Sequence, residues 1–253
     1  MNVNPVAFYV FGVPIYWYGV VISLGLILGT AVAFARTEKY GISQDELLNF
    51  ALVAVPAGVI GARLAFVIIN WDSFAGNWRD MINIRLGGLS IHGAILAAII
   101  VCILFSWIRK LNFWTLADIC APALILGQAV GRWGNYFNQE AYGVPTDLPW
   151  ALYIDGEFRH PIFFYEFAWN LIVFAYLIYI SKKVKMPGGI FLRYLIGYSV
   201  GRFFIEWLRA DTLYWGSLRA GQVMSAIFIV VALVLLLWRK RRFAADRKGE
   251  ENK

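Results

Sequence analysis

Charged residues and cysteines are scarce in this chain. Of its 253 residues, 15% are charged and two are cysteines, whereas 60% are hydrophobic. A soluble globular domain of this length carries more charge than that on its surface. Cys102 and Cys120 both fall within apolar segments, where a thiol behaves as a small hydrophobic group, so neither a disulfide framework nor a zinc-binding spacing can be built. The composition therefore indicates a multi-pass membrane protein.

Several common functional patterns are also absent. The sequence contains no HExxH, no phosphate-binding loop and no GxSxG, so none of the enzyme classes that these motifs mark is indicated. Its first fourteen residues contain no Lys or Arg and no small-residue cleavage pattern. We therefore expect no secretory signal peptide.

Seven apolar segments are long enough to cross a bilayer as helices. They are residues 15–36, 48–69, 90–108, 115–131, 165–181, 189–207 and 221–238. We predict an all-α polytopic membrane protein with about seven transmembrane helices, forming a single membrane domain over residues 1–253. The fourth segment is the least regular, because it is short and carries Asp118, Pro122 and Gln128.

Cationic residues are concentrated on alternate connections between these segments. If the N-terminus lies outside, the inner connections carry fourteen Lys and Arg residues and the outer ones six. The inner set lies within residues 36–39, 109–110, 182–185 and 239–253, and the outer set is Arg79, Arg85, Arg132, Arg159, Arg209 and Arg219. The positive-inside rule then predicts an outer N-terminus and a cytoplasmic C-terminus. The basic tail, residues 239–253, would lie on the anionic inner surface, and we expect no nucleic-acid partner.

The longest connections are on the predicted outer side. Residues 70–89 and 132–164 are rich in Trp, Pro and Gly. Within the second of them, ALYIDGEFRH alternates about Asp155-Gly156, which is a strong hairpin signal. We expect these two connections to form a small outward-facing head that contains a β-hairpin.

The stretch GRWGNYFNQEAYG, residues 131–143, places polar groups directly after the fourth apolar segment. Its polar members are Arg132, Asn135, Asn138 and Glu140, and its glycines are Gly131, Gly134 and Gly143. Aromatic residues beside an arginine are also typical of an interfacial anchor. The amides and the carboxylate favour a functional site, because they add no anchoring and need partners when buried. The glycines predict a sharp turn or a close approach to a ligand.

Five further ionisable residues lie within the apolar segments, all towards their predicted outer ends. They are Arg63, His92, Glu166, Arg202 and Glu206. A charge at a helix centre costs about 2.5–3.5 kcal/mol on insertion scales, so such residues turn towards one another, water or a ligand. They predict a polar chamber that opens outward. Tyr198 and Arg209 extend it, because they share one helix face with Arg202 and Glu206.

Each of these residues also has a structural interpretation. Arg202 and Glu206 could form an ion pair that holds helices together. Arg63 could tether one helix to another, and His92 could bond the backbone at a helix start. The sequence leaves these alternatives open.

Four stretches resemble, in the same order, the bacterial prolipoprotein diacylglyceryl transferase family. They are GGLSIHGAI around His92, GRWGNYFNQEAYG, HPIFFYE from His160 to Glu166, and YSVGRFFIEWLR from Tyr198 to Arg209. The resemblance extends from about Tyr18 to Arg209. Tyr136 departs from the pattern, because the family more often has Phe there, which affects the packing of one ring.

The resemblance implies transfer of the diacylglyceryl group of phosphatidylglycerol to the lipobox cysteine thiol of a lipoprotein precursor, with release of glycerol phosphate. This takes place in the bacterial cytoplasmic membrane, with the active site towards its outer face. The resemblance assigns Arg132, Asn135, Glu140 and Gly143 to the signature, Tyr18 and His92 to the pocket, and Tyr198, Arg202, Glu206 and Arg209 to a facing helix. We predict that His92, Arg132, Tyr198 and Arg202 are catalytic and that the others, with Arg63 and Asn138, bind substrate.

The chemistry of this reaction suits the predicted chamber. Charge grows on the phosphate as the carbon–oxygen bond breaks, and guanidinium groups meet phosphate oxygens bidentately. The acceptor thiol is mostly protonated at neutral pH, so a base such as His92 helps, although a tyrosine or a water could replace it. The substrates supply the thiol and the activated carbon, so we expect no metal and no organic cofactor.

Two other function classes fit parts of the pattern. A lipid or anion transporter also buries Arg and Glu, but it places them near the midplane between repeated halves. A non-catalytic lipid receptor would keep the same chamber. Product formation by the purified protein distinguishes an enzyme from such a receptor.

Overall fold

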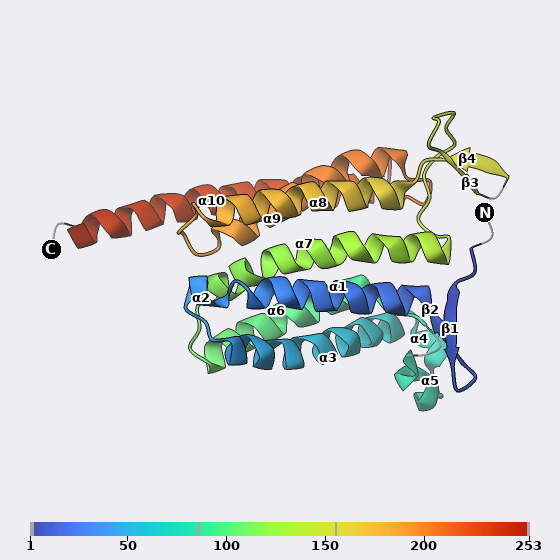
Figure 1. Ribbon diagram of the computed structural model, residues 1–253, viewed down its shortest axis with the longest axis horizontal. Helices are drawn as coiled ribbons and strands as arrows, with labels where there is room; N and C mark the ends of the chain where they lie inside the picture. The colour runs from blue at the N-terminus through green and yellow to red at the C-terminus, as the bar shows by residue number, and fades with distance from the viewer. Residues whose placement is uncertain (1–2, 85–86, 155, 252–253) are drawn as a thin grey trace. The chain divides into compact units, whose positions relative to one another are not determined.

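The computed structural model describes residues 3–84, 87–154 and 156–251, with side chains as far as residue 246. Its elements in chain order (Figure 1) are β1 Val6–Val10, β2 Val13–Tyr16, α1 Trp17–Phe34, α2 Thr37–Tyr40, α3 Gln44–Ile69, α4 Trp71–Phe74, α5 Trp78–Ile82, α6 Ile91–Ile108, α7 Phe113–Asn138, β3 Leu152–Ile154, β4 Glu157–Arg159, α8 Ile162–Ser181, α9 Gly189–Ile205, the 3-10 turn η2 Glu206–Leu208, β5 Tyr214–Trp215, β6 Leu218–Arg219 and α10 Ala220–Glu251. The predicted positions that lie outside this description are Arg85, Asp155, Lys253 and the side chains of Arg247 and Lys248.

Each of the seven predicted apolar segments lies on a long helix. Six of these helices in the described part of the chain are long and apolar enough to cross a membrane, and α9, with 17 residues, is shorter than they are. Local signals explain where α3 begins, because the Ser43 hydroxyl accepts a hydrogen bond from the Glu46 amide at 3.1 Å. The structure thus confirms a mostly helical polytopic protein.

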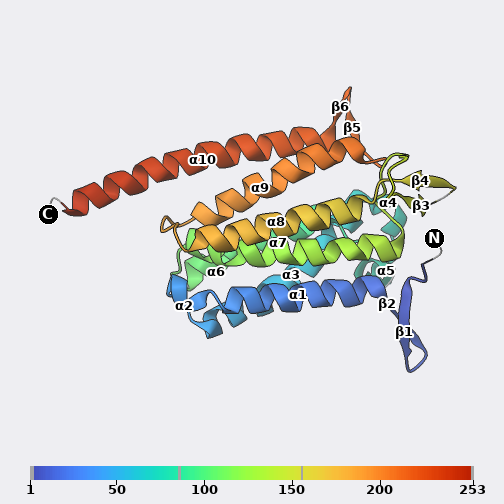
Figure 2. The same ribbon diagram turned by 45° about the horizontal axis from the view of Figure 1, so that its top comes forward.

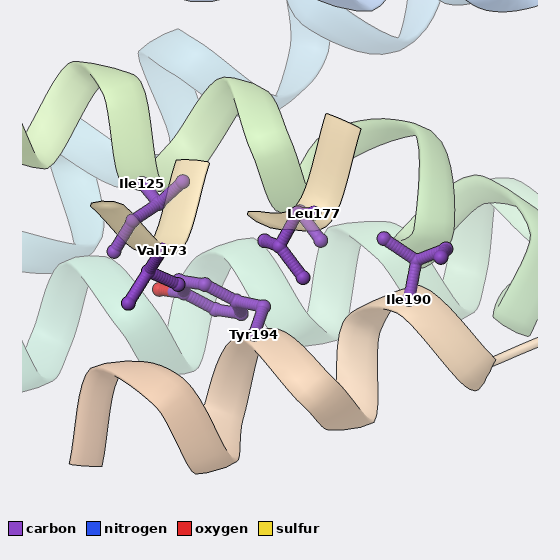
Figure 3. Packing of buried hydrophobic residues seen from close by; sticks show 6 residues of the cluster. Ile125, Val173, Leu177, Ile190 and Tyr194 are labelled. Carbon is purple, nitrogen blue, oxygen red and sulfur yellow. The ribbon is translucent and has the colours of Figure 1, made fainter. Parts of the chain in front are cut away.

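The chain forms two compact units, which we call the large unit, Met1–Ala33 with Asp118–Lys253, and the small unit, Phe34–Ala117. In the large unit, α9 packs beside both α8 and α10 (Figures 1 and 2). Its core joins α7, α8 and α9 through six buried residues (Figure 3), which are Ala121, Ile125, Val173, Leu177, Ile190 and Tyr194. Helix α7 corresponds to the least regular predicted segment, yet it is the most buried of the six candidate spans.

Small residues let α1 approach α7 closely within the large unit. A Cβ atom on Gly29 would lie 2.9 Å from the Ala123 carbonyl oxygen, and one on Gly25 would lie 3.2 Å from the Gly127 carbonyl oxygen. Glycine and alanine at such contacts permit the van der Waals packing that holds membrane helices together. Leucine at either position would separate the two helices.

The same device joins α3 and α6 in the small unit. A Cβ atom on Gly61 would lie 2.7 Å from the Gly93 carbonyl oxygen, and one on Gly93 would collide with the Gly61 carbonyl. At the opposite end of this helix pair, Arg109 forms a salt bridge with Glu46. The hydrogen bond from Arg109 to that carboxylate raises the pKa of Arg109.

The partners of Asp118 explain why this charged residue is tolerated in the apolar helix α7. Its carboxylate accepts hydrogen bonds from the backbone N–H groups of Gly188, Ile190 and Phe191 at 2.8, 2.9 and 2.7 Å. These are donors at the N-terminus of α9, which no residue of that helix can satisfy. Asp118 therefore caps α9 from a neighbouring helix, and its negative charge lies at the favourable end of the helix dipole.

Three two-stranded antiparallel hairpins lie at one end of the large-unit helices (Figures 1 and 2). The hairpin of β3 and β4 pairs Leu152 with Arg159 and Ile154 with Glu157, which confirms the hairpin predicted in this stretch. Residues 142–146 lie beside it, since the His160 amide donates to the Val144 carbonyl at 3.2 Å. The Val144 amide in turn donates to the Leu208 carbonyl at 2.8 Å, so these residues connect the hairpin to the end of η2.

Candidate functional site

A buried carboxylate, Glu166, gathers arginines from separate parts of the large unit. Glu166 lies in the first two turns of α8 and is 5% exposed. Its Oε2 is 3.0 Å from Arg132 Nη1 of α7, and its Oε1 is 2.8 Å from Arg202 Nη1 of α9. Arg209, which follows η2, brings its Nη1 to 3.7 Å from the same Oε1. Helix α7, helix α8 and the stretch from Arg202 to Arg209 thus meet at one carboxylate.

A second carboxylate, Glu206, stands behind this cluster. Its Oε2 is 2.8 Å from Arg202 Nη2 and 3.9 Å from Arg209 Nε, and its Oε1 accepts a hydrogen bond from the Thr212 hydroxyl at 3.2 Å. A side chain on Gly221 of α10 would place Cβ 2.5 Å from this carboxylate. Gly221 therefore makes the room in which Glu206 sits, and the predicted Arg202–Glu206 ion pair is present as one part of a larger network.

The residues predicted to share one helix face, from Tyr198 to Arg209, extend past the end of helix α9. Helix α9 ends at Ile205, and the backbone of Arg209 is extended. Arg209 reaches the cluster because the Arg219 guanidinium donates to the carbonyl oxygens of Glu206 and of Arg209, the latter at 3.3 Å. The helical spacing predicts that Arg209 lies beside Arg202 and Glu206. The 3-10 turn η2 brings it there, and Arg219 of β6 stabilises this turn.

Exposure divides the cluster into an inner and an outer layer. The side chains of Glu166 and Glu206 are 6% and 3% exposed, whereas those of Arg132 and Arg202 are 21% and 24% exposed. Three guanidinium groups face two buried carboxylates, so the buried carboxylates alone do not neutralise the arginines. Asp211, which is half exposed, pairs with Arg209 from the outer side at 2.7 Å. Arg132 and Arg202 therefore present cationic faces that an anion can reach, held from behind by carboxylates.

The polar residues of GRWGNYFNQEAYG lie mostly inside α7, which corrects the expectation that they follow the helix. Helix α7 continues to Asn138, because Gly131 and Gly134 do not end it. Arg132 Nη1 is 3.5 Å from Asn135 Oδ1, and Asn135 Nδ2 donates to Glu140 Oε1 at 3.0 Å. A second donor to the same oxygen is Asn138 Nδ2 at 3.4 Å. These contacts order the side chains in a chain that leads to Arg132.

Left-handed backbone, not glycine, makes the turn after α7. Gln139 has φ 52° and Ala141 has φ 59°, which is a costly conformation for residues with a Cβ. The Glu140 amide donates to the Asn135 carbonyl at 3.0 Å, as in the Schellman ending of a helix. The turn points Glu140 back over the last turn of α7, where Asn135 and Asn138 bind it.

The signature glycines serve close packing against the protein itself. A Cβ on Gly134 would lie 2.7 Å from the ring of Tyr18, and one on Gly143 would lie 2.9 Å from the carbonyl oxygens of His160 and Leu208. Gly143 also donates its amide to the His160 carbonyl at 3.1 Å. The predicted close approach is therefore present, but the partners are Tyr18 of α1 and the residues that follow β4 and end η2.

Sequence reasoning missed a hydrogen-bonded group at the start of α8. The Trp150 indole donates to the Tyr165 hydroxyl at 2.8 Å, and this hydroxyl lies 3.1 Å from His160 Nδ1. His160 and Tyr165 belong to the HPIFFYE stretch, one of the four that carry the family resemblance. Their place in this stretch was the sequence signal that could have identified them. This group fixes the loop that precedes Glu166.

Arg63, in the small unit, is 5% exposed and binds backbone carbonyls. It donates from Nε to Met81 O at 2.9 Å, from Nη2 to Asp80 O at 2.6 Å, and from Nη1 to the carbonyls of Gly87 and Gly88, the latter at 2.9 Å. This geometry supports the tether interpretation, because each guanidinium nitrogen has a carbonyl partner. A direct role of Arg63 in substrate binding stays a prediction.

His92 lies in the first turn of α6, also in the small unit, and is exposed. Within the part of the chain that the structure describes, no residue hydrogen-bonds its imidazole ring, so the backbone-bonded alternative gains no support. Its role as a base stays a prediction.

Tyr198, on α9 one turn before Arg202, lines a small cavity with Arg132 and Glu166. Among residues 3–84, 87–154 and 156–246 no group of His, Cys, Asp and Glu could hold a metal ion.

Comparison with known proteins points to one family. The family described as "Prolipoprotein diacylglyceryl transferase" matches residues 5–238. The phosphatidylglycerol–prolipoprotein diacylglyceryl transferase of Clostridium novyi (strain NT) is 46% identical over 244 residues, which cover 92% of this chain and 95% of that protein. The proteins of the same name from Bacillus cereus (strain G9842) and Bacillus mycoides (strain KBAB4) are 42% and 43% identical over 251 residues, with 94% of this chain and 93% of each relative covered.

Proposed function

Because the chain belongs to the prolipoprotein diacylglyceryl transferase family, we propose that it transfers the diacylglyceryl group of phosphatidylglycerol to a lipoprotein precursor. The acceptor is the lipobox cysteine thiol of the precursor, and the products are a thioether-linked diacylglyceryl protein and glycerol phosphate. The observation that carries the mechanism is the set of three arginines held on the buried Glu166. A lipid or anion transporter and a non-catalytic lipid receptor are the alternatives.

The reaction moves charge onto the phosphate. The thiolate sulfur forms a bond to the terminal glyceryl carbon, and the bond between this carbon and the phosphate oxygen breaks, with its electron pair going to oxygen. A phosphodiester with one negative charge becomes a monoester that approaches two. Arg132 and Arg202 bind the phosphate through their exposed faces and stabilise this added charge more than they stabilise the bound lipid.

The carboxylates act through the arginines. Glu166 and Glu206 are too buried to meet a lipid headgroup, and each bonds to more than one guanidinium. They hold the planar guanidinium groups in orientation before the substrate arrives, so that little reorganisation is needed in the transition state. Arg209 completes this arrangement, and Asn135, Asn138 and Glu140 fix Arg132 from the end of α7.

The thiol proton needs an acceptor. A free cysteine has a pKa of about 8.5, so only a few per cent of it is thiolate at neutral pH. We assign this proton to His92, whose ring is exposed, with Tyr198 and Tyr18 lining the substrate path. No covalent enzyme intermediate is required, because the acceptor thiol is itself the nucleophile.

The membrane arrangement follows from the charge pattern. We propose a bacterial cytoplasmic membrane protein of seven spanning helices, α9 included, with an outer N-terminus, a cytoplasmic tail at residues 239–253 and the hairpin head outside. Cysteine substitutions at the exposed Glu157 and Lys183 test this with an impermeant thiol reagent in intact cells. Labelling at Lys183→Cys without labelling at Glu157→Cys would reverse the orientation.

Reconstitution tests the activity directly. The purified protein, given phosphatidylglycerol and a lipobox peptide, should form the thioether-linked diacylglyceryl peptide and free glycerol phosphate in equal amounts. A peptide with serine in place of cysteine should give no product, because a hydroxyl is far less ionised than a thiol. Lipid movement between leaflets with an intact headgroup and no modified peptide would favour the transporter, and lipid binding alone would favour the receptor.

A further inference from the structure

A small cavity lies beside the arginine cluster of the large unit. Its polar lining residues are Arg132 of α7, Glu166 and Asn170 of α8, and Tyr198 and Arg202 of α9. The volume open to the centre of a water molecule is about 10 Å³. That is at the lower limit of what one water needs, and larger groups cannot enter without movement of the lining.

Asn170 is the unusual member of this lining. It is 2% exposed, and its Nδ2 has no hydrogen-bond partner among the residues that the structure describes. A buried amide donor without a hydrogen-bond partner is destabilising, because it has lost its bonds to water and gained none in the protein. The adjacent Trp169 is satisfied, because its indole nitrogen donates to the Gly197 carbonyl at 2.8 Å. Trp169 lines the same cavity, so of these two neighbouring donors only that of Asn170 is left without a partner among the described residues.

An acceptor lies on the same side of α8. Asn170 follows Glu166 by four residues, which places both side chains on one helix face. Glu166 Oε2 forms a salt bridge with Arg132 Nη1 at 3.0 Å, but it accepts no hydrogen bond from the described residues. This oxygen can therefore still accept a hydrogen bond. The cavity thus lies among an unused donor, an acceptor with spare capacity and the polar side chain of Tyr198.

We propose that Asn170 holds a single oxygen atom in this cavity, a water molecule in the resting protein. Asn170 Nδ2 donates to this oxygen, and the water donates to Glu166 Oε2. The bound water fixes the Glu166 carboxylate between Arg132 and Arg202, so Asn170 is a positioning residue for the phosphate-binding arginines. This role rests on the proposed function. The same chemistry could be supplied by a headgroup oxygen of phosphatidylglycerol, and kinetics separate the two sources.

Two substitutions of Asn170 distinguish donation from packing. Leucine has the same branching and the same number of side-chain heavy atoms as asparagine, but it is bulkier and donates nothing, whereas serine is smaller and keeps a donor. If Asn170 holds an oxygen, Asn170→Leu should fold with unchanged or raised thermal stability and lose at least tenfold in kcat/KM, and Asn170→Ser should retain more activity than Asn170→Leu. If Asn170 only fills space, the leucine variant should be the more active. Ser181→Ala on the same helix, where the hydroxyl donates to the Leu177 carbonyl at 2.6 Å, is the matched control and should leave kcat/KM unchanged.

The split between kcat and KM identifies the source of the oxygen. A water that positions Glu166 predicts a fall in kcat at constant KM for phosphatidylglycerol. A headgroup oxygen predicts a rise in KM, and an analogue without the headgroup hydroxyls should then bind equally to wild type and Asn170→Leu. An Asn170→Leu enzyme with kcat and KM within twofold of wild type would overturn the proposal, while wild-type activity in the same assay tests the proposed function separately. A high-resolution structure without lipid gives a readout independent of activity: we expect one oxygen at hydrogen-bond distance from Asn170 Nδ2, and a dry cavity contradicts it.

Discussion

Two buried carboxylates of the large unit, Asp118 and Glu166, are held by different groups. Asp118 accepts hydrogen bonds from three backbone amides at the start of α9. Glu166, which lies towards the hairpin end, is bound by the side chains of Arg132 and Arg202. Each backbone amide has a single N–H donor, which Asp118 uses, whereas a guanidinium group held by a carboxylate has further N–H donors that can bind a second anion. The first carboxylate therefore stabilises the fold, and the second prepares a site.

The largest expected effect on activity comes from Glu166→Gln. The amide keeps the shape but removes the charge that holds three arginines, so their orientation is lost while the local positive charge increases. We expect kcat to fall by about 10²–10³-fold, the size of losing one oriented transition-state donor. KM for phosphatidylglycerol should stay constant or fall, because ground-state attraction to the phosphate is retained. A variant whose KM rises at unchanged kcat would contradict this assignment.

Asp118→Asn should affect stability and leave catalysis alone. The asparagine amide would place a donor against one of the backbone N–H groups of Gly188, Ile190 or Phe191, leaving buried groups unsatisfied. We expect a loss of about 2–3 kcal/mol in the free energy of unfolding, measured by denaturation in detergent. The kcat of the folded fraction should equal that of wild type. A change in kcat would mean that Asp118 and Glu166 do not have separate roles.

Arg202→Lys tests whether activity requires the planar guanidinium group, with its several N–H donors, or only a positive charge. Lysine keeps the charge but cannot bond Glu166, Glu206 and a phosphate in one plane. We expect kcat/KM to fall at least tenfold. Arg193→Lys is the control on the same helix, because Arg193 donates to the Gly189 carbonyl at 2.7 Å, and the salt bridges of Glu166 and Glu206 among the described residues do not include it. Full activity of Arg202→Lys would leave Arg202 with a purely structural ion pair.

The smallest effect is expected at the turn that follows α7. Ala141 has φ 59°, where a Cβ is strained, so Ala141→Gly should stabilise the protein by about 0.5–1 kcal/mol. Ala141→Val should destabilise it instead. Thermal unfolding of both variants measures the difference, and an equal shift for both would show that the backbone here is not strained.

Local signals predicted much of the fold. Long apolar runs located the seven helices, and the Asp-Gly pair located the β3–β4 hairpin, because both depend on residues close in the sequence. Glycine was misleading at Gly131 and Gly134, where tertiary packing, including the ring of Tyr18, keeps the helix intact. The length of α7 was therefore underestimated.

Long-range partners were not predictable in detail. The amides that bind Asp118 lie about 70 residues further along the chain, and no local pattern announces them. The sequence placed Glu166 in a polar chamber but gave it no role, since only the fold brings α7, α8 and α9 to one carboxylate. Asn170 and Gly221 gave no signal, because a lone amide and a lone glycine in apolar helices are common. The polar character of the site was predictable, and its centre was not.

The central claim is that the arginines held by Glu166 bind the phosphate of the lipid. A structure of the protein in lipid nanodiscs with bound phosphatidylglycerol tests it most directly. We expect phosphate oxygens about 2.7–3.2 Å from guanidinium nitrogens of Arg132 and Arg202, with Glu166 still bonded to both from behind. A phosphate bound elsewhere, with both arginines engaged only by Glu166 and Glu206, would contradict the account.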